Sequence, residues 1–288
     1  MSLRTLLVPV TGREDHQAVV ETALMLAKKF NSHLTALHVR PDPRSAIPFI
    51  GEGLTAEVVQ DLCEAAEREG KTRAATAQAG FDALVAEYEI AAGDGTDAGG
   101  SASYEWEECI GFPADRLGRH ARLADLTIVP KPAESRRSDS GEILHEVLYR
   151  SGRPLLMAPR KLPASVASNI LVAWNGRAEC ARSIAAALPL MANAGNVTLL
   201  TVGKEREGRP SLDALKHYLD CHGIETKLLR ADDGGRSISR VVLETAAREG
   251  ADTLVMGAYS HHRWREMVLG GVTRHVIGQA EIPVFMSH

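Results

Sequence analysis

The residues best suited to hold a ligand lie in one short segment near the end of the chain. Gly257 and Ser260 follow an apolar run, and Gly270, Gly271 and Thr273 stand at or just inside the start of a predicted helix. The first N–H groups of a helix lack partners within the helix and carry partial positive charge, so they attract anions. Because glycine has no side chain, an anion can approach these amides closely. The spacing therefore predicts an anion-binding site.

Polar side chains in the same segment add donors and suggest two other kinds of site. Ser260 and His261 offer hydrogen-bond donors, and Arg263 lies beside the predicted anion. Ser260 next to His261 also suggests a nucleophile–base pair, but no G-x-S-x-G turn surrounds the serine. The adjacent histidines His261 and His262 point in different directions, and no Cys or carboxylate is spaced to complete a metal site. We therefore expect a binding site without catalytic residues and without a metal of its own.

The elements that must position this segment follow from an internal repeat. Residues 7–13 align with residues 171–177, and four of the seven positions are identical. Each copy opens on an apolar run that is followed by a turn and a helical pattern. The sequence therefore predicts two domains, residues 1–160 and 168–288.

Within each copy, short apolar runs alternate with helical stretches. Strands rich in Val, Ile and Leu that are separated by helices are typical of a parallel sheet covered on both faces. Right-handed crossovers then give an α/β fold of two tandem, doubly wound, five-stranded parallel-sheet sandwiches. The predicted strands are Arg4–Val10, Leu34–Val39, Tyr104–Ile110, Leu126–Val129, Pro154–Met157, Ile170–Trp174, Val197–Val202, Glu225–Arg230, Thr253–Gly257 and Pro283–Met286.

Ligands of an open parallel sheet bind at the carboxyl ends of the strands, where the strand order reverses. Gly257 ends one predicted strand at such a place, and Asn175 and Gly176 follow another. Trp174 stands directly before this second turn. Its indole either fills the core or shields a pocket large enough for adenine.

The composition argues against several classes of partner. Lys and Arg total 33 against 37 Asp and Glu, a net charge of −4, so the chain has no large basic field for nucleic acid. The longest apolar runs fall far short of the roughly 18 residues that span a membrane. Four cysteines without C-x-x-C spacing predict reduced, buried thiols in a cytoplasmic protein: Cys63, Cys109, Cys180 and Cys221.

These motifs give the chain a family resemblance. It resembles a tandem universal stress protein, with two UspA-like domains in one polypeptide. The resemblance is carried by the first strand of each copy and by Met256–His261, Leu269–Val276 and Ile282–Val284. It is specific in the second copy and mostly architectural in the first. It implies an adenine nucleotide alpha hydrolase-like fold and a role in stress response.

The resemblance also implies a ligand for the second copy. In nucleotide-binding members of the family, a Gly-x2-Gly-x9-Gly-(Ser/Thr) motif holds the phosphates and ribose. Carried over, it falls on Gly257, Ser260, Gly270 and Gly271, so that a serine replaces one glycine and a glycine replaces the hydroxyl residue. Thr273 offers a hydroxyl further along the helix. The implied ligand is ATP or AMP, with Mg²⁺ only as the companion of a nucleotide.

Two further positions of the second copy are assigned by the resemblance. Asn175 stands where the family has an acidic residue that helps to hold adenosine. Val202, at the end of the next strand, stands where adenine is expected to pack.

The first copy departs further from the family pattern. Pro130 takes the place of Gly257, and Glu142 takes the place of Gly271. A proline removes an amide, and a carboxylate repels phosphate. We therefore expect a structural or dimerising copy that does not bind ATP in the family manner.

The resulting hypothesis is a cytosolic stress-response protein that binds an adenine nucleotide and regulates without turnover. Two alternatives remain at this point: a nucleotide-independent module for protein interaction or dimerisation, and a slow ATP hydrolase. No nucleic-acid or membrane partner is expected. Strand Leu155–Met157 is expected to pair with Val284–Met286 inside the chain. The protein is then either a monomer or a homodimer.

Overall fold

The first copy of the repeat forms one half of a continuous sheet. The protein is represented by a computed structural model that describes residues 3–12, 17–43, 55–96, 100–133, 139–258 and 271–288. The strands of this copy are β1 (Thr5–Pro9), β2 (His33–Arg40), β3 (Ala91–Ala92), β4 (Ser103–Ile110), β5 (Leu126–Pro130) and β6 (Leu155–Ala158). Its helices are α1 (Gln17–Phe30), α2 (Ala56–Tyr88), α3 (Pro113–His120) and α4 (Asp139–Arg150), with a short 3₁₀ turn at Ala121–Leu123.

The second copy follows the same alternation. Its strands are β7 (Asn169–Ala173), β8 (Asn196–Val202), β9 (Lys227–Ala231), β10 (Thr253–Gly257) and β11 (Val284–Ser287). Its helices are α5 (Ala178–Ala192), α6 (Leu212–Cys221), α7 (Ile238–Arg248) and α8 (Gly271–Gln279). Ser211 caps α6, because its hydroxyl accepts a hydrogen bond of 3.1 Å from the N–H of Ala214.

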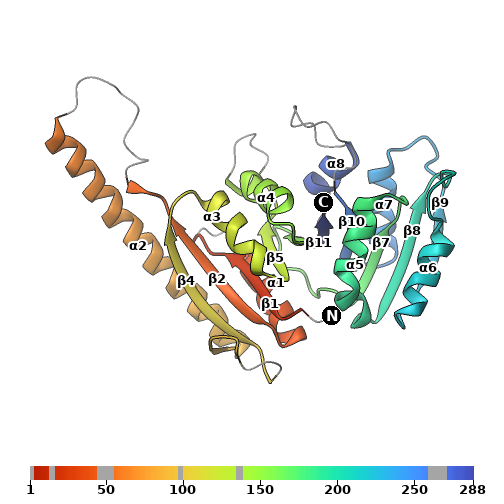
Figure 1. Ribbon diagram of the computed structural model, residues 1–288, viewed down its shortest axis with the longest axis horizontal. Coiled ribbons are helices and arrows are strands. Elements are labelled where there is room, and N and C mark those ends of the chain that lie inside the picture. Colours follow the sequence, from red (N-terminus) through yellow and green to blue (C-terminus); the bar gives the residue numbers. More distant parts are fainter. Residues whose placement is uncertain (1–2, 13–16, 44–54, 97–99, 134–138, 259–270) are drawn as a thin grey trace.

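The described strands form one sheet in the order β3-β4-β2-β1-β5-β6-β11-β10-β7-β8-β9. Every pairing in this order is parallel except that of β6 with β11, which is antiparallel. Figure 1 shows the strands of the two copies side by side, with helices on both sides of the sheet. The predicted fold class, tandem doubly wound α/β sandwiches, is confirmed.

Each face of the sheet has its own apolar core. One core packs α1, α2, α5 and α6 against the sheet, and the other packs α3, α4, α7 and α8 against the opposite face. The central strands are buried on both faces: Val8 in β1 and Leu171 in β7 are at most 2% exposed. This double burial explains why their sequences are continuous apolar runs.

The repeat seen in the sequence is also a repeat of backbone conformation. Gly12 follows β1 and Gly176 follows β7, and both are left-handed, with φ of +72° and +68°. Residues with a side chain rarely adopt this conformation, so both turns require glycine. The two copies therefore leave their first strand in the same way.

The antiparallel contact of β6 with β11 joins the two half-sheets. Leu156 pairs with Phe285, Leu155 with Met286, and Met157 with Val284. All these side chains are fully buried. Beyond the strands, the ammonium of Lys131 donates a hydrogen bond of 2.8 Å to the carbonyl of Ala280 across the same junction.

The segment that connects the copies is also fixed at its second end. Ala167 is fully buried and adopts a left-handed φ of +55°. The ammonium of Lys29, in α1, donates to its carbonyl at 2.6 Å, and its own N–H donates to the hydroxyl of Thr253 at 2.9 Å. The connection is thus held by both copies.

Some local features differ from the sequence predictions. The sequence analysis did not predict the two-residue strand β3. Figure 1 shows that the first part of α2 extends beyond the sheet, and its buried residues begin only at Gly70. The prediction of four buried thiols is wrong: Cys180 is buried, but Cys221 is exposed at the end of α6, and Cys63 and Cys109 are half-buried. None of the described helices has the length and apolar composition needed to cross a bilayer.

The junction between the half-sheets predicts a large cost for a cavity there. Phe285→Ala removes a fully buried ring from β11 and should lower the free energy of unfolding by about 3–5 kcal/mol. Urea unfolding measures this change. The matched control is Phe112→Ala, whose side chain is 71% exposed and whose loss should cost no more than about 0.5 kcal/mol. Equal effects of the two changes would contradict the assignment of the junction as core.

Candidate functional site

The carboxyl ends of β10, β7 and β8 meet at one edge of the second half-sheet. The chain leaves β7 toward β8 on one side and returns to β10 on the other, so the strand order reverses between β7 and β10. This is where a doubly wound sheet binds ligands. The candidate site therefore lies at the residues that follow these three strands.

The structure describes five of the nine predicted site residues. Val202 and Gly257 end β8 and β10, and Asn175 follows β7, so the three lie at the ends of adjacent strands. Gly271 and Thr273 lie at the start of α8. The other four predicted residues lie outside the described part of the chain: Ser260, His261, Arg263 and Gly270.

Gly257 is a glycine for a reason that the sequence did not reveal. A Cβ at this position would lie 2.5 Å from the backbone nitrogen of Cys180 and 2.7 Å from the carbonyl carbon of Glu179. The first turn of α5 therefore packs directly against the end of β10. Packing alone requires glycine here, whether or not a ligand binds.

Trp174 is part of the core. The residue is 8% exposed, and its indole N–H donates a hydrogen bond of 3.1 Å to the carbonyl of Pro210. Of the two interpretations of this aromatic residue, the structure favours the core filler. The hydrogen bond also ties the loop between β8 and α6 to the end of β7.

The turn after β7 is covered by that same loop. A guanidinium nitrogen of Arg209 donates to the carbonyl of Asn175 at 3.3 Å, and the side chain of Arg209 packs on Gly176. The amide oxygen of Asn175 accepts a hydrogen bond of 2.9 Å from the N–H of Arg177, which closes the turn. The exposed Asn175 therefore shapes the entrance to α5.

The start of α8 is more open than the end of β10. A Cβ at Gly271 would meet no heavy atom of the described residues within 4 Å. Thr273 is 5% exposed, so its side chain is turned into the protein. Val202 is half-buried and packs against the core on the α7 and α8 face. Of these residues, Gly271 leaves the most room for a ligand.

Sequence analysis missed one buried residue at this edge, Glu179, and predicted the burial of its neighbour, Cys180. Glu179 is 7% exposed, and its Oε1 has no hydrogen-bond partner within the part of the chain that the structure describes. Cys180, the next residue, is 3% exposed. Burial raises the pKa of the Cys180 thiol to about 11, although hydrogen bonds from the backbone of Gly257 and Asn175 oppose this shift.

The corresponding edge of the first copy is built differently. Pro130 ends β5 as Gly257 ends β10, and the first turn of α4 contains Asp139 and Glu142. The methyl group of Ala77, in α2, lies 3.0 Å from where a Cβ of Gly12 would be, so α2 packs on the turn after β1. Acidic side chains and a long helix therefore stand where the second copy has a short loop and Gly271.

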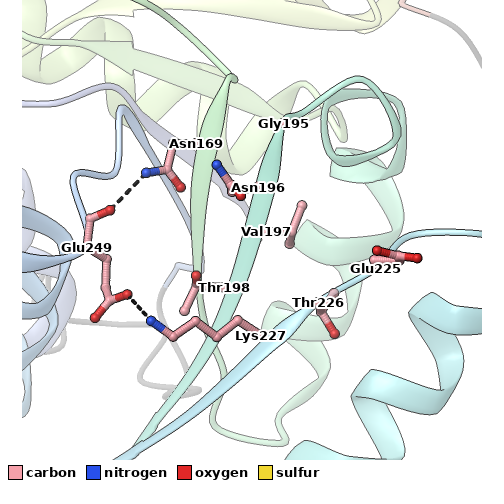
Figure 2. Close-up of a pocket in the computed structure, with 9 residues that line it drawn as sticks. All are labelled: Asn169, Gly195, Asn196, Val197, Thr198, Glu225, Thr226, Lys227 and Glu249. Atoms are coloured by element: carbon pink, nitrogen blue, oxygen red, sulfur yellow. Dashed lines mark hydrogen bonds and ion pairs between the residues drawn. The ribbon is translucent and has the colours of Figure 1, made fainter.

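The second copy also has an open cavity of about 480 Å³ at the opposite, amino edge of its sheet. Figure 2 shows Asn169 and Thr198 on neighbouring strands and Lys227 reaching toward Glu249. The ammonium donates a hydrogen bond of 2.6 Å to this carboxylate and holds the pKa of Glu249 below its usual range. Lys227 and Glu249 of this cavity are thus paired with each other, and the cavity lies at the end of the sheet where ligands of this fold do not bind.

The described residues contain no cluster of three His, Cys, Asp or Glu side chains that could hold a metal ion.

A family profile, a curated relative and solved structures all relate this chain to the same family. The profile described as "Universal stress protein family" matches residues 2–157 and again residues 167–288. Universal stress protein Slr1230 of Synechocystis is 25% identical over 189 residues, which cover 60% of this chain and 61% of that protein. The chain thus spans about three fifths of the length of this curated relative.

Solved structures share the fold at low sequence identity. The crystal structure of a universal stress protein from Archaeoglobus fulgidus matches with a TM-score of 0.69 at 15% identity, over 100% of this chain and 99% of that one. A functionally unknown protein of Pseudomonas aeruginosa, PA1789, matches with a TM-score of 0.56 at 13% identity, over 99% and 92% of the two chains. Both cover the two copies together.

The packing of α5 on β10 can be tested at Gly257. Gly257→Ala places a methyl group against the backbone of Glu179 and Cys180 and should lower the free energy of unfolding by about 1–3 kcal/mol, measured by urea denaturation. The control is Gly271→Ala, which meets open space at a helix start and should be neutral or stabilising by up to about 1 kcal/mol. A neutral Gly257→Ala would refute the packing argument.

The burial of Cys180 predicts which thiol reacts. With a pKa near 11, roughly one thiol in ten thousand is ionised at pH 7, and the side chain is also inaccessible. Iodoacetamide should therefore label the exposed Cys221 in the folded protein and leave Cys180 unlabelled, as read by peptide mass spectrometry. Both should label in urea. Rapid labelling of Cys180 in the folded protein would contradict this assignment.

Proposed function

The chain belongs to the universal stress protein family, and on this premise we propose that it is a cytosolic regulatory protein whose second copy binds an adenine nucleotide without turnover. The ligand is AMP or ATP, and Mg²⁺ enters only with the phosphates. The phosphates lie on the amides around Gly257 and at the start of α8, and the base lies near Val202.

The observation that carries this proposal is the difference between the starts of α8 and α4. The first described residue of α8 is Gly271, with open space where a side chain would be. The corresponding position in α4 is Glu142, in a first turn that also contains Asp139. Helix N-termini attract anions when no acidic side chain occupies them. Among the described residues, the first turn of α8 contains no acidic side chain, whereas the first turn of α4 contains two.

The predicted ligand residues that lie outside the described part of the chain belong to the same proposal. Ser260, His261 and Arg263 would supply donors to the phosphates, and Gly270 would supply a further amide. Thr273 is 5% exposed and turned into the protein, so a phosphate at this helix meets the exposed Gly271 before it meets the Thr273 hydroxyl.

The thiol at the described edge is unsuited to catalyse turnover. Phosphoryl hydrolysis needs a group that activates water or a nucleophile that is ionised near neutral pH. The thiol of Cys180 retains its proton there because burial raises its pKa to about 11. We propose that the nucleotide acts as a signal and that its occupancy changes with the state of the cell.

We assign the first copy, residues 1–160, a structural role beside the binding copy, residues 168–288. Its acidic first turn in α4 and the contact of Ala77 with Gly12 both disfavour a nucleotide at the equivalent edge. One nucleotide per chain is therefore expected.

A second candidate, a protein-interaction module, is favoured by a different observation. Apolar side chains are exposed on the first copy: Val58 and Leu62 on the part of α2 that extends beyond the sheet, and Phe112 before α3. A stable partner on this surface would bury them. Experiments can distinguish the two candidate functions, because nucleotide binding would depend on residues of the second copy and partner binding on residues of the first.

Binding is tested by equilibrium dialysis of AMP and ATP at millimolar protein. The protein should retain about one nucleotide per chain, and Gly271→Asp should weaken retention tenfold or more, because a carboxylate fills the open helix start and repels phosphate. Phosphate release from ATP should equal that of buffer.

The matched control is Gly278→Asp, which adds the same charge roughly 10 Å further along α8. It should retain nucleotide like the parent protein. No retained nucleotide in the parent, or equal loss in both variants, would refute nucleotide binding at this helix start.

A further inference from the structure

The carboxylate of Glu179 is the least satisfied charged group at the candidate site. The residue is 93% buried, as its exposed fraction is 7%, and its Oε1 has no hydrogen-bond partner within the described residues. A buried carboxylate oxygen without a partner is costly and rare, so Oε1 points to a donor that is absent from the described residues.

Another buried glutamate of the same protein shows what a satisfied carboxylate looks like. Glu21, in α1, is 9% exposed. Its Oε1 accepts a hydrogen bond of 2.8 Å from the side chain of Gln17, and its Oε2 accepts one of 3.2 Å from the hydroxyl of Tyr88. The contrast sets Glu179 apart from glutamates whose role is structural.

The position of Glu179 places it at the ligand edge. The side chain lies against the end of β10, since a Cβ on Gly257 would come within 2.7 Å of its Cγ. It is the second residue of α5, whose first turn faces the same edge, so the partial positive charge of this helix start stabilises the carboxylate. The α5 terminus thus already holds an anion that belongs to the protein.

This arrangement has two consequences for a ligand. The unpaired oxygen of Glu179 is itself buried, so it can accept a hydrogen bond only from an N–H or O–H group that enters between α5 and the end of β10. The same negative charge repels each additional phosphate of a ligand held beside it. One carboxylate therefore favours donors and disfavours anions.

We propose that Glu179 selects the ligand: it accepts a hydrogen bond from a nucleoside hydroxyl or amino group and makes the site prefer adenosine or AMP to metal-free ATP. This inference rests on the proposed nucleotide site and narrows its ligand class. The open start of α8 takes one phosphate, and Glu179 excludes a longer phosphate chain.

The test compares adenosine, AMP and ATP, each with EDTA, by calorimetry on the whole chain and on two variants. The parent protein should bind ATP more weakly than AMP, by about fivefold for each added charge. Glu179→Gln should bind adenosine about tenfold more weakly, because the charged acceptor is lost, and should bind ATP as well as or better than the parent does. Opposite changes for two ligands cannot come from a general loss of structure.

The control is Glu225→Gln, which removes the same charge at the amino edge of the sheet and should leave all three affinities unchanged. If the parent binds ATP at least as tightly as AMP, or if Glu179→Gln shifts adenosine and ATP equally, the selective role of Glu179 is refuted while the nucleotide site stands. If the parent binds none of the three, the site and the inference fall together. Should Glu179→Gln not fold, the ratio of ATP to AMP affinity in the parent decides.

Discussion

The antiparallel pairing of β6 with β11 is the contact on which the arrangement of the two copies depends. It joins the six strands of the first copy and the five strands of the second into one sheet of eleven described strands. It also buries Leu156 and Phe285 completely. A strand at the edge of a sheet is prone to pair with another chain. Here each copy covers the edge of the other, and the contacts of Lys131 and Lys29 hold the copies together on either side.

Within this frame the two copies differ at the carboxyl edge of the sheet, where we propose that the second copy binds its ligand. The glycine after the first strand is left-handed in both, so the backbone has been kept. What covers that glycine differs: the long helix α2, through Ala77, covers Gly12, whereas a loop that carries Arg209 covers Gly176. In the first copy a helix covers the turn after the first strand, and in the second copy a loop covers the equivalent turn. The same fold therefore surrounds the carboxyl edge of the sheet in two different ways.

Much of the fold could be predicted because its signals are local. The runs that form β1, β7 and β10 are rich in apolar residues because these strands are buried on both faces of the sheet. β3 escaped prediction because two alanines carry no periodicity. Glu179 escaped because an acidic residue in a first helical turn looks the same whether buried or exposed. Its burial depends on the end of β10, which lies far away in sequence, and no local pattern encodes that contact.

The contact of α5 with Gly257 also bears on how such sequences diverge. A glycine that the packing of a helix demands is retained by selection for folding, even in a descendant that has ceased to respond to any metabolite. No described residue packs against Gly271 in this way, so substitutions there can accumulate once binding is no longer selected. The presence of Gly257 therefore says little about ligand binding in a related sequence, whereas the residue at the position of Gly271 is informative.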